Sequence, residues 1–217
     1  MEERCYRLGA GGAVFRLPGS RLDPWDWRWV EDPDGPPGDA APGTAVQALT
    51  HLARLARTGE ARRLPVAVIG PREASADQTA IAEALGRRLG ELGLTVVCGG
   101  KGGVMAAVSR GTRAAGGLTV GLLPDADWRG ANADVALPIA TGLSEARNVV
   151  IARCAMALVA VGGSYGTMTE IAYGLHFGKP VIGLAGAPAL EGVEIVADVD
   201  VAVARLADAL LTLPDMS

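Results

Sequence analysis

The clearest chemical signature lies at residues 162–170, which read GGSYGTMTE. An apolar run, residues 156–161, precedes this stretch, and a helix-like pattern follows it. A strand is therefore expected to break into glycines and to restart as a helix. Glycines let a backbone approach a ligand closely, and the free N–H groups of a helix's first turn attract anions. This layout predicts a site for a phosphate-bearing ligand.

A second stretch repeats the layout upstream. The apolar run 94–98 enters the glycine-rich residues 99–103, and a helix-like pattern resumes at residue 104. Lys101 attracts notice because the chain has only one other lysine, Lys179. The stretch has neither the GxGxxG spacing of a dinucleotide-binding turn nor the GxxxxGK[ST] spacing of a nucleotide-triphosphate loop. ATP hydrolysis is therefore not supported.

Two arginines are further candidates for the site. Arg72 follows the first apolar run through Gly70 and Pro71, and its guanidinium could bind a phosphate or carboxylate bidentately. The alternative is a solvated loop arginine. Ser144 is expected to cap a helix in which Arg147 occupies the first turn. Because a cation there opposes the helix dipole, we expect Arg147 to serve a ligand.

Glu170 has a purely structural interpretation beside the functional one. Thr167 and Glu170 have the spacing of a capping box, in which the glutamate reaches back to the backbone N–H of the capping residue. The combination of several candidate sites favours the functional interpretation.

The elements that must position these residues alternate along the chain. Nearly unbroken apolar runs, typical of strands buried on both faces, occur at residues 65–69, 94–98, 118–123, 135–139, 155–161 and 180–184, with a further edge strand expected at 193–199. Helical patterns lie between them, at residues 76–92, 104–115, 145–153, 168–177 and 201–211. The alternation predicts a doubly wound, mostly parallel Rossmann-like sheet of about six to seven strands with helices on both faces. Ligands of such sheets bind beyond the carboxyl ends of the strands, where both glycine turns lie.

Composition narrows the class of protein. With 49% hydrophobic and 20% charged residues, the 217-residue chain can bury a core and is not disordered. The net charge of −4 argues against nucleic acid as a partner. No apolar run approaches 18 residues and the N-terminus lacks a signal-peptide core, so a cytoplasmic location without a membrane span is expected. Three widely spaced cysteines argue against a metal site or a disulfide framework.

The chain is expected to divide near residue 60. Residues 1–60 predict a small β-rich appendage, with meander strands at 5–8, 13–17 and 26–30, a Pro/Gly linker at 31–43 and an amphipathic helix at 45–57. Residues 61–217 form the nucleotide- or phosphate-binding domain. Trp25, Trp27 and Trp29 alternate and would share one face of a strand. We expect them to form either the core of the appendage or its contact with the main domain, or else an aromatic lid or partner-binding face.

Several motifs in order resemble a known superfamily. They are GGKGGVM at 99–105, GLLP at 121–124, Ala131-Asn132, Thr141-Gly142, Ala146-Arg147-Asn148 and GGSYGTMTE at 162–170. Together they are similar to the LOG-like Rossmann-fold group related to DNA-processing protein A, and most similar to its molybdenum cofactor carrier branch. The resemblance covers about residues 65–185 and does not extend to residues 1–60.

The resemblance implies roles for two residues. LOG enzymes are phosphoribohydrolases that cleave the N-glycosidic bond of a nucleoside 5′-monophosphate with an arginine and a glutamate, and Arg147 and Glu170 match those positions. A carboxylate could stabilise the positive charge that develops on the ribosyl group and orient water. This chain departs from the enzymes in having Gly162 for proline, Ser164 for glycine and Asn148 for lysine, and its first loop lacks the expected Gly-Ser. These departures match the carrier-like branch and favour binding over catalysis.

The sequence thus predicts a protein that binds a small phosphorylated molecule, either a nucleotide or a molybdopterin-type cofactor, in a carrier or sensor role. The alternative is a LOG-type phosphoribohydrolase with Arg147 and Glu170 as catalytic residues; single-stranded DNA binding is disfavoured. The predicted ligand-binding residues are Gly70, Arg72, Gly99, Gly100, Lys101, Gly102, Gly103, Met105, Asn148, Gly162, Gly163, Ser164, Tyr165, Gly166 and Thr167. Trp128 is placed to stack on a ligand ring. The resemblance also implies a homodimer or larger homo-oligomer.

Overall fold

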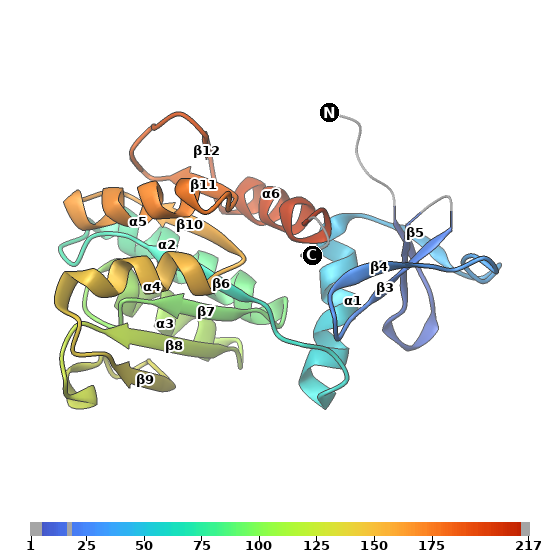
Figure 1. The fold of residues 1–217 in the computed structure, drawn as a ribbon, viewed down its shortest axis with the longest axis horizontal. Helices are drawn as coiled ribbons and strands as arrows, with labels where there is room; N and C mark the ends of the chain where they lie inside the picture. Colours follow the sequence, from blue (N-terminus) through green and yellow to red (C-terminus); the bar gives the residue numbers. More distant parts are fainter. Residues whose placement is uncertain (1–5, 17–18, 214–217) are drawn as a thin grey trace. The chain divides into compact units, whose positions relative to one another are not determined.

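A computed structural model describes residues 6–16 and 19–213 of the chain (Figure 1). The chain forms two compact units. One contains the residues up to Arg63 together with the chain from Ala207 onward, and the other spans Leu64–Leu206. Among the described residues, no helix combines the length and apolar character needed to cross a membrane.

The larger unit is built on one seven-stranded sheet in the order β12-β11-β10-β6-β7-β8-β9. Its strands are β6 (Pro65–Ile69), β7 (Thr95–Cys98), β8 (Leu118–Leu123), β9 (Leu137–Ala140), β10 (Ala157–Val161), β11 (Val181–Leu184) and β12 (Val193–Ile195). Every neighbouring pair is parallel. The strand order reverses between β6 and β10, so a crevice is expected where their carboxyl ends diverge. This confirms the predicted doubly wound α/β fold.

Helices cover both faces of this sheet. They are α2 (Ala76–Glu91), α3 (Val104–Ala114), α4 (Arg147–Cys154) and α5 (Tyr165–His176). Helix α6 (Val199–Leu211) follows β12, and its residues from Ala207 onward belong to the smaller unit. Helix α2 packs against α3, and α4 packs against α5. Figure 1 shows α4 in front of the sheet and α3 behind it. The predicted capping box at the start of α2 is present, with Ser75 and Gln78 satisfying each other's backbone N–H groups.

Glycines explain how closely α2 and α3 pack. A Cβ on Gly86 would lie 2.2 Å from the Val108 carbonyl oxygen, and one on Gly111 would lie 1.9 Å from the Glu83 carbonyl oxygen. No real Cβ tolerates such distances, so these two positions need glycine for space. The strands that these helices cover are themselves buried, with β10 inaccessible along its whole length.

Two predicted strands differ from the structure at the edges of the sheet. The run 135–139 was expected to be buried, but β9 covers Leu137–Ala140 and exposes Leu137 and Ile139. The reason is its place as the last strand of the sheet, which the apolar composition does not reveal. The run 193–199 supplies the expected edge strand only as far as Ile195, since Val199 already begins α6.

The smaller unit contains a five-stranded antiparallel sheet in the order β4-β3-β2-β1-β5, together with helix α1 (Ala45–Thr58). The strands are β1 (Tyr6–Leu8), β2 (Val14–Arg16), β3 (Ser20–Asp23), β4 (Arg28–Glu31) and β5 (Ala41–Gly43). The predicted linker is therefore wrong at its end, because β5 pairs with β1. Strand β3 was not predicted. Cys5, Leu17 and Pro18, which the predicted strands and turns included, lie outside the described residues.

The three tryptophans do not share one strand face, contrary to the prediction. Trp25 and Trp27 lie in the turn between β3 and β4, and only Trp29 lies in β4. The indole N–H groups of Trp27 and Trp29 donate hydrogen bonds of 3.0 Å to the carbonyls of Leu210 and Leu211 at the end of α6. Two tryptophans thus satisfy carbonyls that a helix C-terminus leaves free. Because these carbonyls belong to the same unit as the tryptophans, this supports the interpretation of Trp27 and Trp29 as part of the unit's own core.

Candidate functional site

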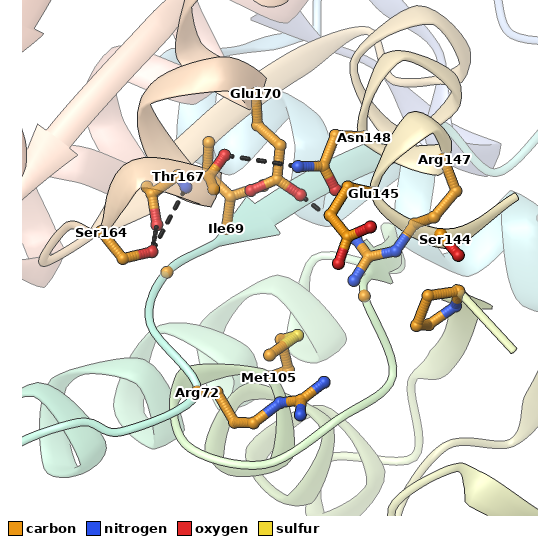
Figure 2. Close-up of a pocket in the computed structure, with 14 residues that line it drawn as sticks. Ile69, Arg72, Met105, Ser144, Glu145, Arg147, Asn148, Ser164, Thr167 and Glu170 are labelled. Carbon is orange, nitrogen blue, oxygen red and sulfur yellow. Dashed lines mark hydrogen bonds and ion pairs between the residues drawn. The ribbon is translucent and has the colours of Figure 1, made fainter.

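A cavity of about 170 Å³ lies at the carboxyl ends of the central strands (Figure 2). Its lining comes from the ends of β6, β7 and β8 and from the segments that begin α4 and α5. The lining residues are Ile69, Gly70, Arg72, Gly99, Met105, Pro124, Ser144, Glu145, Arg147, Asn148, Ser164, Gly166, Thr167 and Glu170. Ten of them were predicted as site residues from the sequence. The cavity thus lies at the strand-order reversal between β6 and β10.

The α5 N-terminus forms one wall of the cavity. Ser164 has an extended backbone and is the N-cap, and its Oγ accepts a 3.4 Å hydrogen bond from the Thr167 backbone N–H. The helix was expected to begin at residue 168, but the turn at Gly162, with φ of +64°, already redirects the chain. Gly166 and Thr167 in the first helical turn therefore line the cavity. Because the Thr167 N–H already bonds Ser164, Gly166 is the one of the two whose N–H is left to attract an anion.

The capping-box interpretation of Thr167 and Glu170 is wrong. Because Ser164 is the cap, Glu170 lies beyond the first turn, and its carboxylate contacts Arg147. Arg147 lies in the first turn of α4, as expected, but α4 begins at Arg147 and not at residue 145, and Ser144 is not its N-cap. Ser144 instead opens a short 3₁₀ segment, Ser144–Ala146, with a φ of +48°.

Arg147 and Glu170 form a buried pair at the cavity. Arg147 Nη1 lies 3.4 Å from Glu170 Oε1, and the two side chains are 10% and 8% exposed. Arg147 Nε is buried without a hydrogen-bond partner among the described residues. A guanidinium has five N–H donors, so this one retains unused donors beside the cavity. Buried donors without acceptors are costly, which makes the pair suited to an anionic ligand.

Burial shifts the protonation of both partners. Desolvation raises the pKa of Glu170 from 4.5 to about 7, although the Arg147 charge opposes the shift. Desolvation likewise lowers the pKa of Arg147 below its ordinary value, against the stabilising charge of Glu170. Glu170 therefore exchanges its proton near neutral pH, which suits either general base chemistry or an uncharged carboxyl beside an anion.

Asn148 connects the two helices that carry this pair. Its Nδ2 donates to Thr169 Oγ1 at 2.9 Å and more weakly to the Gly166 carbonyl at 3.5 Å. The side-chain amide thereby fixes the start of α4 to the first turns of α5. Asn148 is buried and lines the cavity.

The glycine-rich turn after β7 contributes less than predicted. Only Gly99 of its five residues lines the cavity, together with Met105 from α3. A Cβ at Gly99 would lie 2.4 Å from Arg147 Nη2, so glycine is needed there to seat the guanidinium. Lys101 lies outside the lining, because its ammonium pairs with the Asp125 carboxylate and donates to the Gly130 carbonyl at 3.0 Å.

The remaining glycines of both turns serve the packing of the chain. Gly100 lies against Leu123, and Gly103 against the Pro71 and Arg72 carbonyls. Gly102 is also absent from the lining. In the second turn, Gly162 lies against Gln78 and Gly163 against Pro188, while Tyr165 is 90% exposed. None of these residues lines the cavity.

Arg72 is an available cation at the cavity. It follows β6 through Gly70 and Pro71, is exposed, and forms no ion pair or hydrogen bond with any described residue. Figure 2 shows its guanidinium near Met105, separate from the Arg147–Glu170 pair. The expectation of a bidentate ligand contact is compatible with this position.

The sequence prediction missed four lining residues: Ile69, Pro124, Ser144 and Glu145. Ile69 and Pro124 lie at the ends of β6 and β8, so the rule that ligands bind beyond strand ends could have identified them. Ser144 and Glu145 needed the tertiary turn. Trp128 is half exposed beneath the Arg129 guanidinium and does not line the cavity, so the structure gives no support to its predicted stacking role.

The larger unit is similar to several known proteins. An uncharacterized protein of Archaeoglobus fulgidus is 39% identical over 133 residues, which cover 61% of this chain and 87% of that protein. The molybdenum cofactor binding protein of Rippkaea orientalis is 29% identical with a TM-score of 0.65, covering 70% of this chain and 99% of that one. The molybdenum cofactor carrier protein of Chlamydomonas reinhardtii is 34% identical with a TM-score of 0.65, covering 70% of this chain and 100% of that one.

DNA processing protein A of Streptococcus pneumoniae is more distant. It is 18% identical with a TM-score of 0.50, covering 64% of this chain and 60% of that one, and this likeness concerns the fold alone. Residues 63–208 match the SLOG cluster4 family. These similarities confirm the resemblance drawn from the motifs. The chain belongs to the SLOG cluster4 family.

Proposed function

We propose that this protein binds a small phosphorylated molecule, a nucleotide or a molybdopterin-type cofactor, and acts as a carrier or sensor. The observation that carries the proposal is the buried Arg147, whose donors are largely unused beside the cavity. The similarity to molybdenum cofactor carrier proteins supports a cofactor as the cargo.

In this proposal, the phosphate binds between the α5 N-terminus and the two arginines. Gly166 presents a backbone donor, Ser164 and Thr167 contribute hydroxyl groups, and Arg72 adds an unpaired positive charge. Arg147 completes its hydrogen bonds on the phosphate oxygens. A Glu170 with a pKa of about 7 spends part of its time uncharged at neutral pH, which reduces its repulsion of the anion.

The phosphoribohydrolase remains a second candidate because of Glu170. A carboxylate with a pKa of about 7 is tuned to accept a proton at neutral pH. Glu170 would take a proton from water as the water oxygen bonds to the anomeric carbon and the C–N bond breaks. The base would leave with the bonding electrons and accept the proton that Glu170 took from water, which yields free base and ribose 5-phosphate and regenerates the carboxylate.

One experiment separates the two candidates. Purified protein is incubated with a panel of nucleoside 5′-monophosphates, and free base and ribose 5-phosphate are followed by chromatography, while calorimetry measures binding of the same compounds and of a phosphorylated pterin. Binding without release supports the carrier or sensor. Release that disappears in Glu170→Gln supports the hydrolase. A folded protein that binds none of the compounds contradicts the proposal.

We further propose that α5 contacts a second copy of this chain. Tyr165, Met168 and Tyr173 are 90%, 39% and 39% exposed and lie along one side of the helix. Such a stripe can meet itself across a two-fold axis. Light scattering should report a dimer or larger assembly that Met168→Glu disrupts, and a monomeric wild-type protein would contradict this assignment.

A further inference from the structure

Glu145 is a free carboxylate in a cavity assigned above to an anion. It is exposed and lines the cavity, and its carboxylate forms no hydrogen bond or ion pair with any described residue, although its charge acts on Arg147. The nearby acids differ, since Glu170 pairs with Arg147 and Asp125 with Lys101. Because a carboxylate repels a phosphate, Glu145 must face another part of the ligand.

Glu145 lies across the cavity from the α5 N-terminus, which forms one wall of the proposed phosphate position. Figure 2 shows Glu145 beside Arg147, with Ser164 and Thr167 on the other side of the view. The cavity of about 170 Å³ is also smaller than the roughly 300–1,000 Å³ typical of sites that enclose a drug-sized ligand. A nucleotide-sized ligand with its phosphate at Ser164 would therefore extend out of the cavity past the exposed carboxylate of Glu145.

The backbone around Glu145 is held to the end of β8. Ser144 donates its N–H to the Pro124 carbonyl at 3.0 Å, and Thr141 Oγ1 donates to the Leu123 carbonyl at 2.7 Å. Ser144 also adopts a φ of +48°, which is unfavourable for a residue with a side chain. The surrounding contacts thus impose this turn and keep Glu145 at the cavity wall.

We propose that Glu145 recognises the N–H edge of a 2-amino-4-oxopyrimidine ring, which guanine and pterins share. The inference rests on the proposed function, because it assumes that the phosphate binds at Ser164. A ring N–H and the adjacent amino group present two parallel donors, which match the two oxygens of a carboxylate. Adenine presents a ring acceptor at the corresponding edge, which the carboxylate repels. The sugar of a nucleotide adjoins its phosphate and would lie deeper, so the ring is the part that reaches Glu145.

The test compares four phosphates by calorimetry: GMP, IMP, AMP and a phosphorylated pterin. Wild-type protein should bind GMP or the pterin about 10- to 100-fold more tightly than AMP, because GMP and the pterin donate two charge-assisted hydrogen bonds to Glu145 that AMP cannot donate. IMP, which lacks the amino group, should fall between them. The tighter of GMP and the pterin identifies the source of the ring.

Glu145→Gln should reduce this preference to less than about 3-fold without weakening AMP binding. Glu73→Gln is the matched control, since Glu73 is an exposed acid on the Arg72 loop that does not line the cavity, and it should retain the full preference. Thermal melting of both variants verifies that they fold.

Three outcomes would overturn the inference. Equal binding of GMP and AMP by the wild-type protein removes the ring preference, and a preference that persists in Glu145→Gln assigns it elsewhere. Equal weakening of GMP and AMP in Glu145→Gln means that Glu145 contacts the sugar hydroxyls. In each case the proposed function stands, because phosphates still bind; failure of all four compounds to bind contradicts both.

Discussion

The two glycine-rich turns look alike in the sequence but perform different tasks. The turn after β10 presents Ser164, Gly166 and Thr167 to the cavity, whereas the turn after β7 presents only Gly99. In the β7 turn, Gly103 lies against carbonyl oxygens and Lys101 is paired with Asp125. A glycine-rich strand-to-helix turn therefore indicates close approach of the backbone to something, which can be a ligand or the protein itself.

The largest expected effect is on stability, in the β7 turn. Gly103 has a φ of +62°, and a Cβ there would lie 2.3 Å from the Arg72 carbonyl oxygen and 2.4 Å from that of Pro71. Gly103→Ala should destabilise the protein by roughly 3–5 kcal/mol, through backbone strain and overpacking. Urea denaturation measures the loss. Gly102→Ala is the matched control, because its Cβ would meet nothing closer than 3.7 Å; equal losses in the two variants would refute the packing explanation.

The next effect concerns Glu170, which the β10 turn positions. Burial raises its pKa to about 7, so between about pH 4.5 and pH 7 the folded state binds more protons than the unfolded chain. Stability should therefore fall as pH rises through this window and level off above it. Relative to Glu170→Gln, the wild-type protein should lose on the order of 2–3 kcal/mol between pH 5 and pH 8. Urea denaturation at both pH values gives the slopes, and parallel slopes would show that Glu170 titrates normally.

A smaller effect separates the tasks of the two turns directly. A Cβ on Gly166 would meet nothing closer than 3.8 Å, and alanine is the better helix former. Gly166→Ala should therefore preserve or slightly raise the Tm, yet weaken binding of a phosphate-bearing ligand about 10-fold by blocking its approach to the backbone. Calorimetry and thermal melting on the same sample measure both quantities. Unchanged affinity would show that the ligand does not approach this turn.

The smallest effect is expected at Lys101, which the sequence marked as a ligand residue. Lys101→Met removes its contacts with Asp125 and Gly130, so the Tm should fall by no more than about 4 °C. Ligand affinity should change less than about 3-fold, because the side chain does not line the cavity. A large loss of affinity with an unchanged Tm would mean that Lys101 exchanges Asp125 for the ligand.

Much of the larger unit was predictable because its strands are buried. β6 and β8 match their predicted bounds, and α2 begins at its predicted capping box. The smaller unit was less predictable, since its short antiparallel strands have weak patterns. β5 contains a proline within a segment rich in Asp, Pro and Gly, and its pairing with β1 depends on a distant part of the chain.

The site, like the fold, was predictable from the sequence only in part. The spacing of residue types identified the β10 turn, and the family resemblance pointed to Arg147 and Glu170, but local spacing suggested a capping box at Thr167 and Glu170. Ser164 took the capping position one turn earlier, and Glu170 was left to meet Arg147 from another helix. Whether Glu170 meets the Thr167 backbone or Arg147 therefore depends on the residue at which the turn before α5 ends.

The sequence by itself determined the doubly wound fold and the position of the site at strand ends. Periodicity and glycine placement are local properties, and they are sufficient for those conclusions. Only the tertiary structure decided which glycines face the cavity, that Lys101 forms an ion pair with Asp125 and that the carboxylate of Glu145 forms none. These outcomes depend on distances between segments far apart in the chain, which no local pattern encodes.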